Sequence, residues 1–317
     1  MTDLREVARA WRQHQASIAR STVIRTAVAW STLDQNDLSG SWSASVGPAM
    51  VRTLTAAQRL ATVGASRYVA AAVGAQEGDP AAEGTVNSTA FAGMSADGRT
   101  LSGLLYVPVI RTKTAIGAGL PVREALASGA NELAMLVANE VADAGRNAAG
   151  VAMTATRSVH GYVRMVSGSA CSRCIILAGR HYRWHADFKR HPRCSCTSVP
   201  DIENRAGDIS TDPHAFFDHL SPAQQDKRFG KADAQAIREG ADINQVVNAR
   251  RGLYETKVFG RDVQATFEGT TRRGAARRQM TAAGVRGPRL SVAQIYADAA
   301  EDRDLAISLL RRYGYLT

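Results

Sequence analysis

Apolar positions in the first half of the chain repeat at intervals of three, four and seven residues, which is the period of an amphipathic helix. Leu4, Val7, Trp11 and Ile18 show this spacing clearly. The pattern predicts helices over residues 3–32, about 48–73, 100–117 and from Pro121 onward. The stretch QEGDPAAEGTVNST predicts a loop between the second and third helices. We therefore expect a helical assembly, and this half of the sequence shows no catalytic pattern.

The pattern changes near residue 160, where HGYVRMVSGS alternates apolar and polar positions. Such alternation predicts a strand, and further short strands are predicted at 182–184 and from Cys196 onward. Helices resume after these strands. Ser221 and Ser291 are each followed three residues later by glutamine, which is the pattern of a capping box at the start of a helix.

Composition indicates a compartment and a class of partner. No uncharged apolar run approaches the roughly 18–20 residues of a membrane span, and the N-terminus, MTDLREVARA, lacks the apolar core of a signal peptide. We therefore expect a protein made and kept in a reducing cytoplasm, where clustered cysteines indicate metal binding rather than disulfides. The net charge of +10 and the pI near 9.8 indicate an anionic partner, with nucleic acid the first candidate.

All four cysteines lie in one short window. Cys171 and Cys174 form a C-x2-C pair, and Cys194 and Cys196 form a C-x-C pair shortly after His191. In a C-x2-C turn both sulfurs can face one point, and side chains two residues apart on a strand share a face. Cysteines and a histidine grouped in this way indicate a tetrahedral structural zinc site.

Five residues thus compete for four ligand positions. We favour a ligand set of three cysteines with His191, which leaves one downstream cysteine free. All four cysteines form the alternative set. His181 and His185 are more distant candidates. A closed set of four protein ligands leaves no open position for a substrate, so such a zinc supports structure rather than catalysis. Four thiols without metal, or two disulfides, are the remaining interpretations, although a C-x-C pair bridges itself only with strain.

These elements predict a mainly α protein with a small central α+β zinc-binding module. We divide the chain into an α-helical domain at 1–156, a small α+β Cys/His zinc module at 157–205 and a helical C-terminal region at 206–317. The C-terminal region contains a basic, Gly-rich segment at 250–290.

The central module contains the C-x2-C pair, then Leu177-Ala178-Gly179, Tyr182 and His191-Pro192-Arg193-Cys194-Ser195-Cys196. With these residues it resembles the signature of the MuF-like family of phage head morphogenesis proteins. The resemblance covers residues 160–200, and weaker similarity extends over 216–274. GYVRMVSGSACSRC, GADINQVVNARRG and EGTTRRG are similar to the form found in phages of actinobacteria. Many relatives end near the cysteine motif, whereas here residues 197–317 follow it.

The resemblance implies a minor capsid protein of the virion, present in few copies at the portal and inside the head. Its implied role is head morphogenesis, DNA packaging or ejection, without turnover of a substrate. The implied partners are the portal protein, the major capsid or scaffold protein, and packaged DNA bound without sequence preference. No membrane partner is expected.

The segment 250–290 is rich in arginine, and Glu255, Asp262 and Glu268 are its acidic residues. Its glycines predict an irregular, mobile backbone, and arginines on such an arm suit sequence-independent contacts with phosphates. A solvated loop, or an arm that docks on an acidic partner such as a portal subunit, is an equal alternative. The residues predicted to contact nucleic acid or a partner are Arg250, Arg251, Arg272, Arg273, Arg277 and Arg278.

An enzymatic function has less support in the sequence. No G-x-S-x-G, H-E-x-x-H, P-loop or Rossmann motif is present. A serine-type capsid maturation protease is the first alternative, since Ser167, Ser169 and His160 lie near one another in sequence, but no nucleophile is defined. A zinc-stabilised nuclease with His185 or His191 as its base is the second, and no Asn or second His stands at the spacing that such a site needs.

Overall fold

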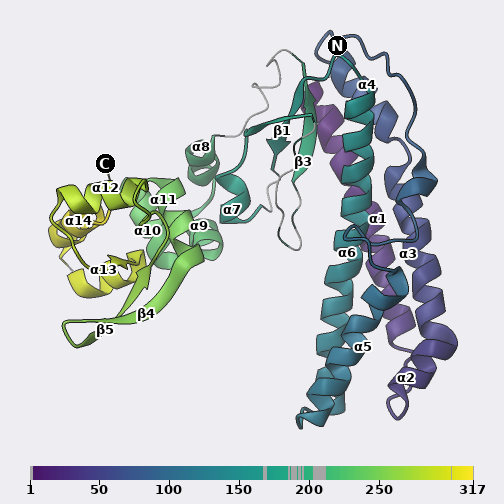
Figure 1. The fold of residues 1–317 in the computed structure, drawn as a ribbon, viewed down its shortest axis with the longest axis horizontal. Helices are drawn as coiled ribbons and strands as arrows, with labels where there is room; N and C mark the ends of the chain where they lie inside the picture. The colour runs from purple at the N-terminus through teal and green to yellow at the C-terminus, as the bar shows by residue number, and fades with distance from the viewer. Residues whose placement is uncertain are drawn as a thin grey trace. The chain divides into compact units, whose positions relative to one another are not determined.

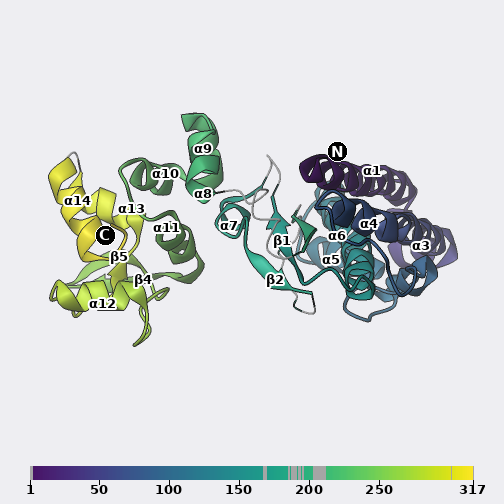
Figure 2. The same ribbon diagram turned by 90° about the horizontal axis from the view of Figure 1, so that it is seen from above.

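The structure is a computed structural model that describes residues 3–166, 170–184, 186, 191, 194, 196–202, 212–300 and 302–316. The chain divides into two compact units. The first contains residues 1–165 and 179–210, and the second contains residues 166–178 and 211–317. Figures 1 and 2 show the elements of each unit.

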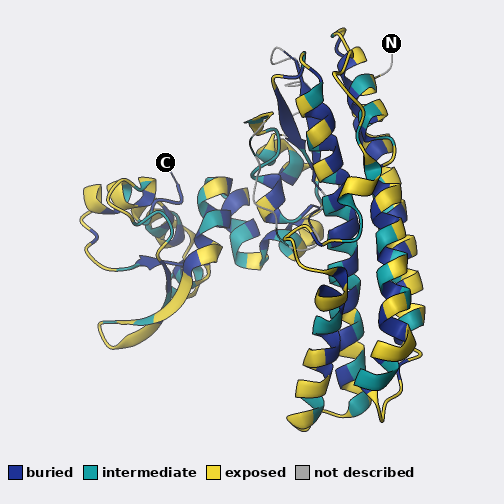
Figure 3. Ribbon diagram, turned by 45° about the vertical axis from the view of Figure 1, so that its right-hand side comes forward, coloured by how far each residue is buried: buried dark blue, intermediate teal, exposed yellow. Residues whose placement is uncertain are grey.

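Helices make up most of the first unit. They are α1 (Leu4–Trp30), α2 (Leu38–Ser41), α3 (Gly47–Thr62), α4 (Ala65–Gly74), α5 (Leu101–Gly117) and α6 (Val122–Ala155). The long helix α6 packs against α1, α3, α4 and α5, and these helices lie side by side in Figure 1. Their apolar stripes meet in a common core, and Figure 3 shows these inward faces as buried. Members of this core include Trp30, Leu54, Leu105, Val137 and Val141.

The single helix predicted over 48–73 is wrong, because the structure has two helices there. α3 ends at Thr62 and α4 begins at Ala65. Gly64 between them has a φ of 89°, a left-handed conformation that interrupts the helix and that glycine adopts without steric cost. The helix predicted from Pro121 onward is confirmed as α6, with Pro121 at its N-cap position.

A small antiparallel sheet packs on the helices of the first unit. Its strands are β1 (Gly161–Met165), β2 (His181–Arg183) and β3 (Thr197–Asp201), in the order β2-β1-β3. The hydroxyl of Tyr68 donates to the carbonyl of Ser198 at 2.7 Å, and Gln76 Nε2 donates to the carbonyl of Pro200 at 2.9 Å. Because both acceptors lie on β3, these bonds fix on the helical core the strand that directly follows Cys196.

The second unit combines short helices with a three-stranded antiparallel sheet of order β4-β5-β6. In its core the rings of Phe217 and Phe229 meet edge to face, with centroids 5.0 Å apart. The elements are α7 (Ser172–Ile175), α8 (Pro213–Asp218), α9 (Pro222–Phe229), α10 (Lys231–Arg238), α11 (Ile243–Ala249), β4 (Leu253–Val258), β5 (Arg261–Thr266), α12 (Ala275–Ala282), β6 (Arg289–Leu290), α13 (Val292–Ala299) and α14 (Arg303–Arg312). The fold class predicted from the sequence, mainly α with a small α+β module, is confirmed.

The segment 250–290 forms regular strands and a helix, so the irregular backbone predicted from its glycines is wrong. β4 and β5 form a hairpin, and α12 and β6 follow it. Gly260, with a φ of 79°, lies in the hairpin turn, and Gly284, with a φ of 74°, follows α12. These glycines therefore supply the left-handed conformations that turns between regular elements require.

The two predicted capping boxes differ. At Ser221 the box is complete, because the Gln224 N–H bonds the serine Oγ and the Ser221 N–H donates to Gln224 Oε1. At Ser291 the serine Oγ accepts from the Gln294 N–H, but Gln294 Oε1 accepts from the backbone of Gln264 on β5. The second box is therefore half formed, and its glutamine ties α13 to the sheet instead.

Candidate metal centre

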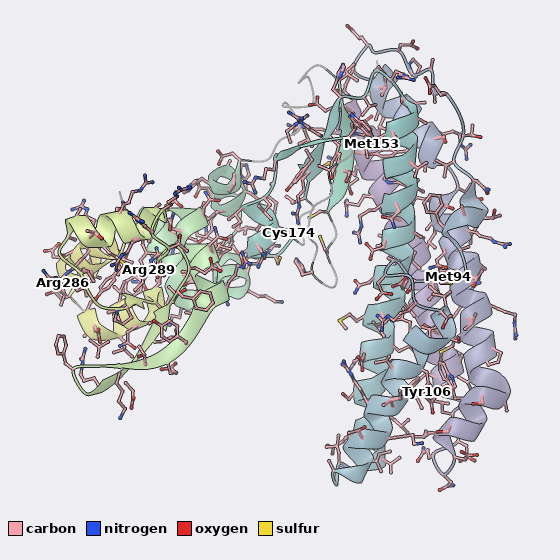
Figure 4. The ribbon with its side chains drawn as sticks, viewed as in Figure 1. Met94, Tyr106, Met153, Cys174, Arg286 and Arg289 are labelled. Atoms are coloured by element: carbon pink, nitrogen blue, oxygen red, sulfur yellow. The ribbon has the colours of Figure 1, made fainter. Side chains whose placement is uncertain are left out.

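The cysteines of the motif lie on short ordered elements or directly beside them. Cys171 occupies the N-cap position of α7, and Cys174 lies within that single turn. Cys194 and Cys196 precede β3. Cys174, Cys194 and Cys196 are 2%, 6% and 3% exposed, Cys171 is half-buried, and none of the four forms a disulfide. Figure 4 marks Cys174.

The five predicted ligands come together in two overlapping groups. One contains Cys171, Cys174 and His191, and the other contains Cys174, Cys194 and Cys196. Within each group the candidate ligand atoms all lie within 4.8 Å of one another. Sulfurs bound to one zinc at about 2.3 Å in a tetrahedron lie roughly 3.8 Å apart, so small side-chain movements suffice to bind an ion. These side chains can hold a metal ion, and Cys174 is common to both groups.

Arg164 on β1 lies against two of these sulfurs. It is 2% exposed, and its Nη2 donates to Cys196 Sγ at 3.3 Å and to Cys194 Sγ at 3.8 Å. A buried guanidinium requires compensating negative charge. Three or four thiolates around a divalent ion would supply it, because such a ligand set carries net negative charge. The sulfurs of Cys194 and Cys196 and the guanidinium of Arg164 therefore form one electrostatic unit.

A second arginine positions the backbone beside the sulfurs. Arg146 on α6 donates from Nη1 to the carbonyl of Cys194 at 3.0 Å and from Nη2 to Asp143 Oδ1 at 2.9 Å. Sequence reasoning identified neither Arg164 nor Arg146. The alternation of apolar and polar positions predicts an exposed Arg164, whereas four of the five residues of β1, Arg164 among them, are buried. Arg146 lies on a helix far from the motif in sequence and offers no signal.

The other histidines and serines considered from the sequence lie elsewhere. His181 Nε2 is 2.9 Å from Asp201 Oδ2, and neither metal-binding group found among the described residues includes it. His160 is exposed. Ser167, Ser169 and His185 fall outside the residues that the structure describes. The protease and nuclease interpretations therefore remain predictions.

The arginines nominated for nucleic acid or a partner fall into two kinds. Arg250 Nε lies 3.4 Å from Asp233 Oδ2, and Arg251 Nε lies 3.7 Å from Glu268 Oε1. The others are exposed, on α12 or in the turn before it: Arg272, Arg273, Arg277 and Arg278. Acidic neighbours thus already partner the first two.

Comparison with known proteins identifies no relative of this chain. No protein family, curated protein or solved structure matches this chain. In the part of the chain that the structure describes, no helix combines the length and apolar character needed to cross a membrane.

Proposed function

We propose that the Cys/His cluster holds one structural zinc ion. Sulfur and imidazole donors at these separations fit zinc, which takes four such ligands in a tetrahedron. Cys174, Cys194 and Cys196 are buried, as expected for ligands of a closed structural site rather than an open catalytic one. Roughly 10 kcal/mol of metal-binding energy would strongly stabilise the short segments that carry these ligands.

We further propose that the chain is a minor capsid protein of a tailed bacteriophage. It would act in head morphogenesis at the portal and the inner head, with a role in DNA packaging or ejection. The observation that carries this proposal is the convergence of the cysteines with His191, because these residues are also the core of the resemblance to the MuF-like family. The zinc would then maintain a docking module, and the protein would turn over no substrate.

Zinc content and particle content test the two parts of the proposal separately. Chain purified under reducing conditions without added metal should carry about one zinc per molecule and lose structure on chelation. Mass spectrometry of purified particles should find the chain intact and in low copy, and the chain should co-purify with the portal protein. A Cys174→Ser chain should be depleted from particles, whereas an Arg183→Gln chain, changed at an exposed position of β2, should be incorporated normally.

Other outcomes would favour the alternatives. Cleavage of capsid or scaffold protein by the purified chain would support the maturation protease. Magnesium-dependent degradation of DNA would support the nuclease. Absence of the chain from particles, with zinc present, would remove the capsid role and leave the metal site standing.

A further inference from the structure

The surface of α12 and its flanking turns carries positive charge without opposing acids. Residues 269–297 contain no aspartate or glutamate. We call the exposed arginines of this stretch the arginine surface. Its members are Arg272, Arg273, Arg277, Arg278 and Arg286.

Packing and backbone bonds hold this surface in place. Ala276 and Met280, on the inner side of α12, are 0% and 1% exposed. The Gly274 N–H donates to the Thr271 carbonyl at 2.8 Å, and the Arg277 N–H donates to the Gly269 carbonyl at 3.0 Å. The arginines therefore project from an ordered scaffold, which lowers the entropic cost of binding compared with a mobile arm.

The charges of the arginine surface remain available to a ligand. Among the described residues, none of its arginines forms an ion pair, whereas neighbouring basic residues do: Arg250 with Asp233, Arg251 with Glu268, and Arg261 with Asp298. Arginine presents fixed, planar donors that match phosphate oxygens. A polyanion can approach this surface without displacing an internal partner.

The composition of the surface favours duplex nucleic acid over a protein. Protein interfaces place apolar and aromatic anchors at their centre, but no large apolar side chain is exposed among the described residues of 268–304. Single strands are bound largely by stacking of bases on aromatic rings. No ring is exposed among the described residues of 268–304, and the exposed ring of Phe267 just before them stacks on Tyr254, with centroids 6.4 Å apart. We propose that the arginine surface binds the phosphate backbone of double-stranded DNA without sequence preference.

As a contact with packaged DNA, this inference rests on the proposed capsid function. As a duplex-binding surface, it can be tested on the purified full chain alone. If the chain binds duplex DNA through α12 but is absent from particles, only the capsid role is contradicted. If the chain is present in particles but its α12 does not bind DNA, only this inference is contradicted.

The experiment measures binding of two labelled DNA duplexes of unrelated sequence by fluorescence anisotropy across salt concentrations. The test variant is R272Q/R273Q/R277Q/R278Q. The control variant, R9Q/R25Q/R52Q/R59Q, removes the same charge from exposed positions of α1 and α3 in the other unit. Thermal unfolding of both variants checks that they remain folded.

Wild-type protein should bind both duplexes equally, with an affinity that falls steeply as salt rises. The α12 variant should bind roughly 10²-fold more weakly at ~50 mM salt, and its slope of log K against log salt should be shallower by about 3 to 4. The control variant should retain most of the affinity and slope. Unchanged binding by the α12 variant, or equal loss in the control, would overturn the proposal. So would α12-dependent binding of poly-glutamate without α12-dependent binding of DNA, which would assign the surface to an acidic protein.

Discussion

Arg164 donates to Cys196 from inside the protein, with its Nη2 3.3 Å from the sulfur and the residue 2% exposed. A buried cation beside a neutral thiol is unfavourable, whereas a buried cation beside a metal-bound thiolate is stabilised. We therefore expect this contact to stabilise ionised sulfurs more than neutral thiols, which supports the proposed metal site.

The first prediction concerns the charge of Arg164. Arg164→Met keeps much of the side-chain volume but removes the donor to the sulfurs, so metal affinity should fall about 10–100-fold, as for other groups that support metal ligands. Competition with a chromogenic chelator measures this change. Arg183→Met, at an exposed position of β2, should leave affinity unchanged. If the cluster binds no metal, Arg164→Met should instead be neutral or stabilising, since replacing a buried charge by an apolar side chain often is.

The second prediction uses the position of Cys174 in both groups. Cys174→Ser disrupts both sets of ligands, whereas Cys171→Ser leaves Cys174, Cys194 and Cys196 together. Zinc per chain should therefore fall close to zero in Cys174→Ser and only partly in Cys171→Ser, with a parallel order of thermal stability. Elemental analysis of the purified variants gives the ratio. Equal retention of metal in Cys174→Ser and wild type would place the ion elsewhere.

The Cys/His cluster could be predicted from the sequence because the pattern that defines it is local. The pair of Cys171 and Cys174, followed by Cys194 and Cys196 after His191, fixes ligand type and spacing without knowledge of the rest of the fold. The long helices were predictable for a similar reason, since a period of three to four residues persists over many turns. Which four of the five residues bind stays a prediction, because the two groups found share Cys174.

The errors of the sequence-based prediction lie where tertiary contacts or single backbone angles determine the structure. Apolar spacing continues through Gly64, so the break between α3 and α4 depends on one φ of 89° that periodicity does not report. The glycines of 250–290 indicated irregular backbone, but they lie at turns between strands and helices. Charge counting also could not tell an exposed arginine from a buried one, because burial depends on elements distant in sequence.

The third prediction concerns a buried carboxyl in the second unit. Burial raises the pKa of Asp233 to about 6, although Arg250 nearby opposes the shift. A carboxyl with a raised pKa binds its proton more tightly in the folded state, so its contribution to stability is present at low pH and is lost as pH rises through about 4 to 6. Above pH 6 the ionised group therefore destabilises the fold.

Asp233→Asn should remove this penalty. Above pH 6 the unfolding free energy of the variant should exceed that of the wild type by about 1–3 kcal/mol. The lost interaction with the half-exposed Arg250 keeps this gain small. The gain should vanish toward pH 4. Denaturant unfolding of both proteins from pH 4 to 8 measures it, and taking their difference cancels the effects of other groups. A difference that is constant with pH would show that the ionisation of Asp233 has no part in stability.

The fourth prediction compares two arginines three residues apart, both marked in Figure 4. Arg286 is exposed, whereas Arg289 is 1% exposed. Arg289 Nε donates to the Tyr313 carbonyl at 2.9 Å, and its Nη1 donates to the Glu268 carbonyl at 3.0 Å. Its guanidinium carbon lies 4.0 Å from the centroid of the Tyr315 ring. Burial lowers the pKa of Arg289, but these acceptors and the ring hold the cation in place.

Removal of this side chain should therefore leave buried carbonyls without a donor and loosen the C-terminal residues. Arg289→Ala should cost roughly 3–5 kcal/mol of unfolding free energy, whereas Arg286→Ala should change it by less than about 0.5 kcal/mol. Denaturant titration of the two variants provides the comparison. Each variant loses one positive charge from the same segment, so a large difference between them can come only from burial and hydrogen bonding. Equal, small effects would mean that the contacts of Arg289 do not hold the second unit together.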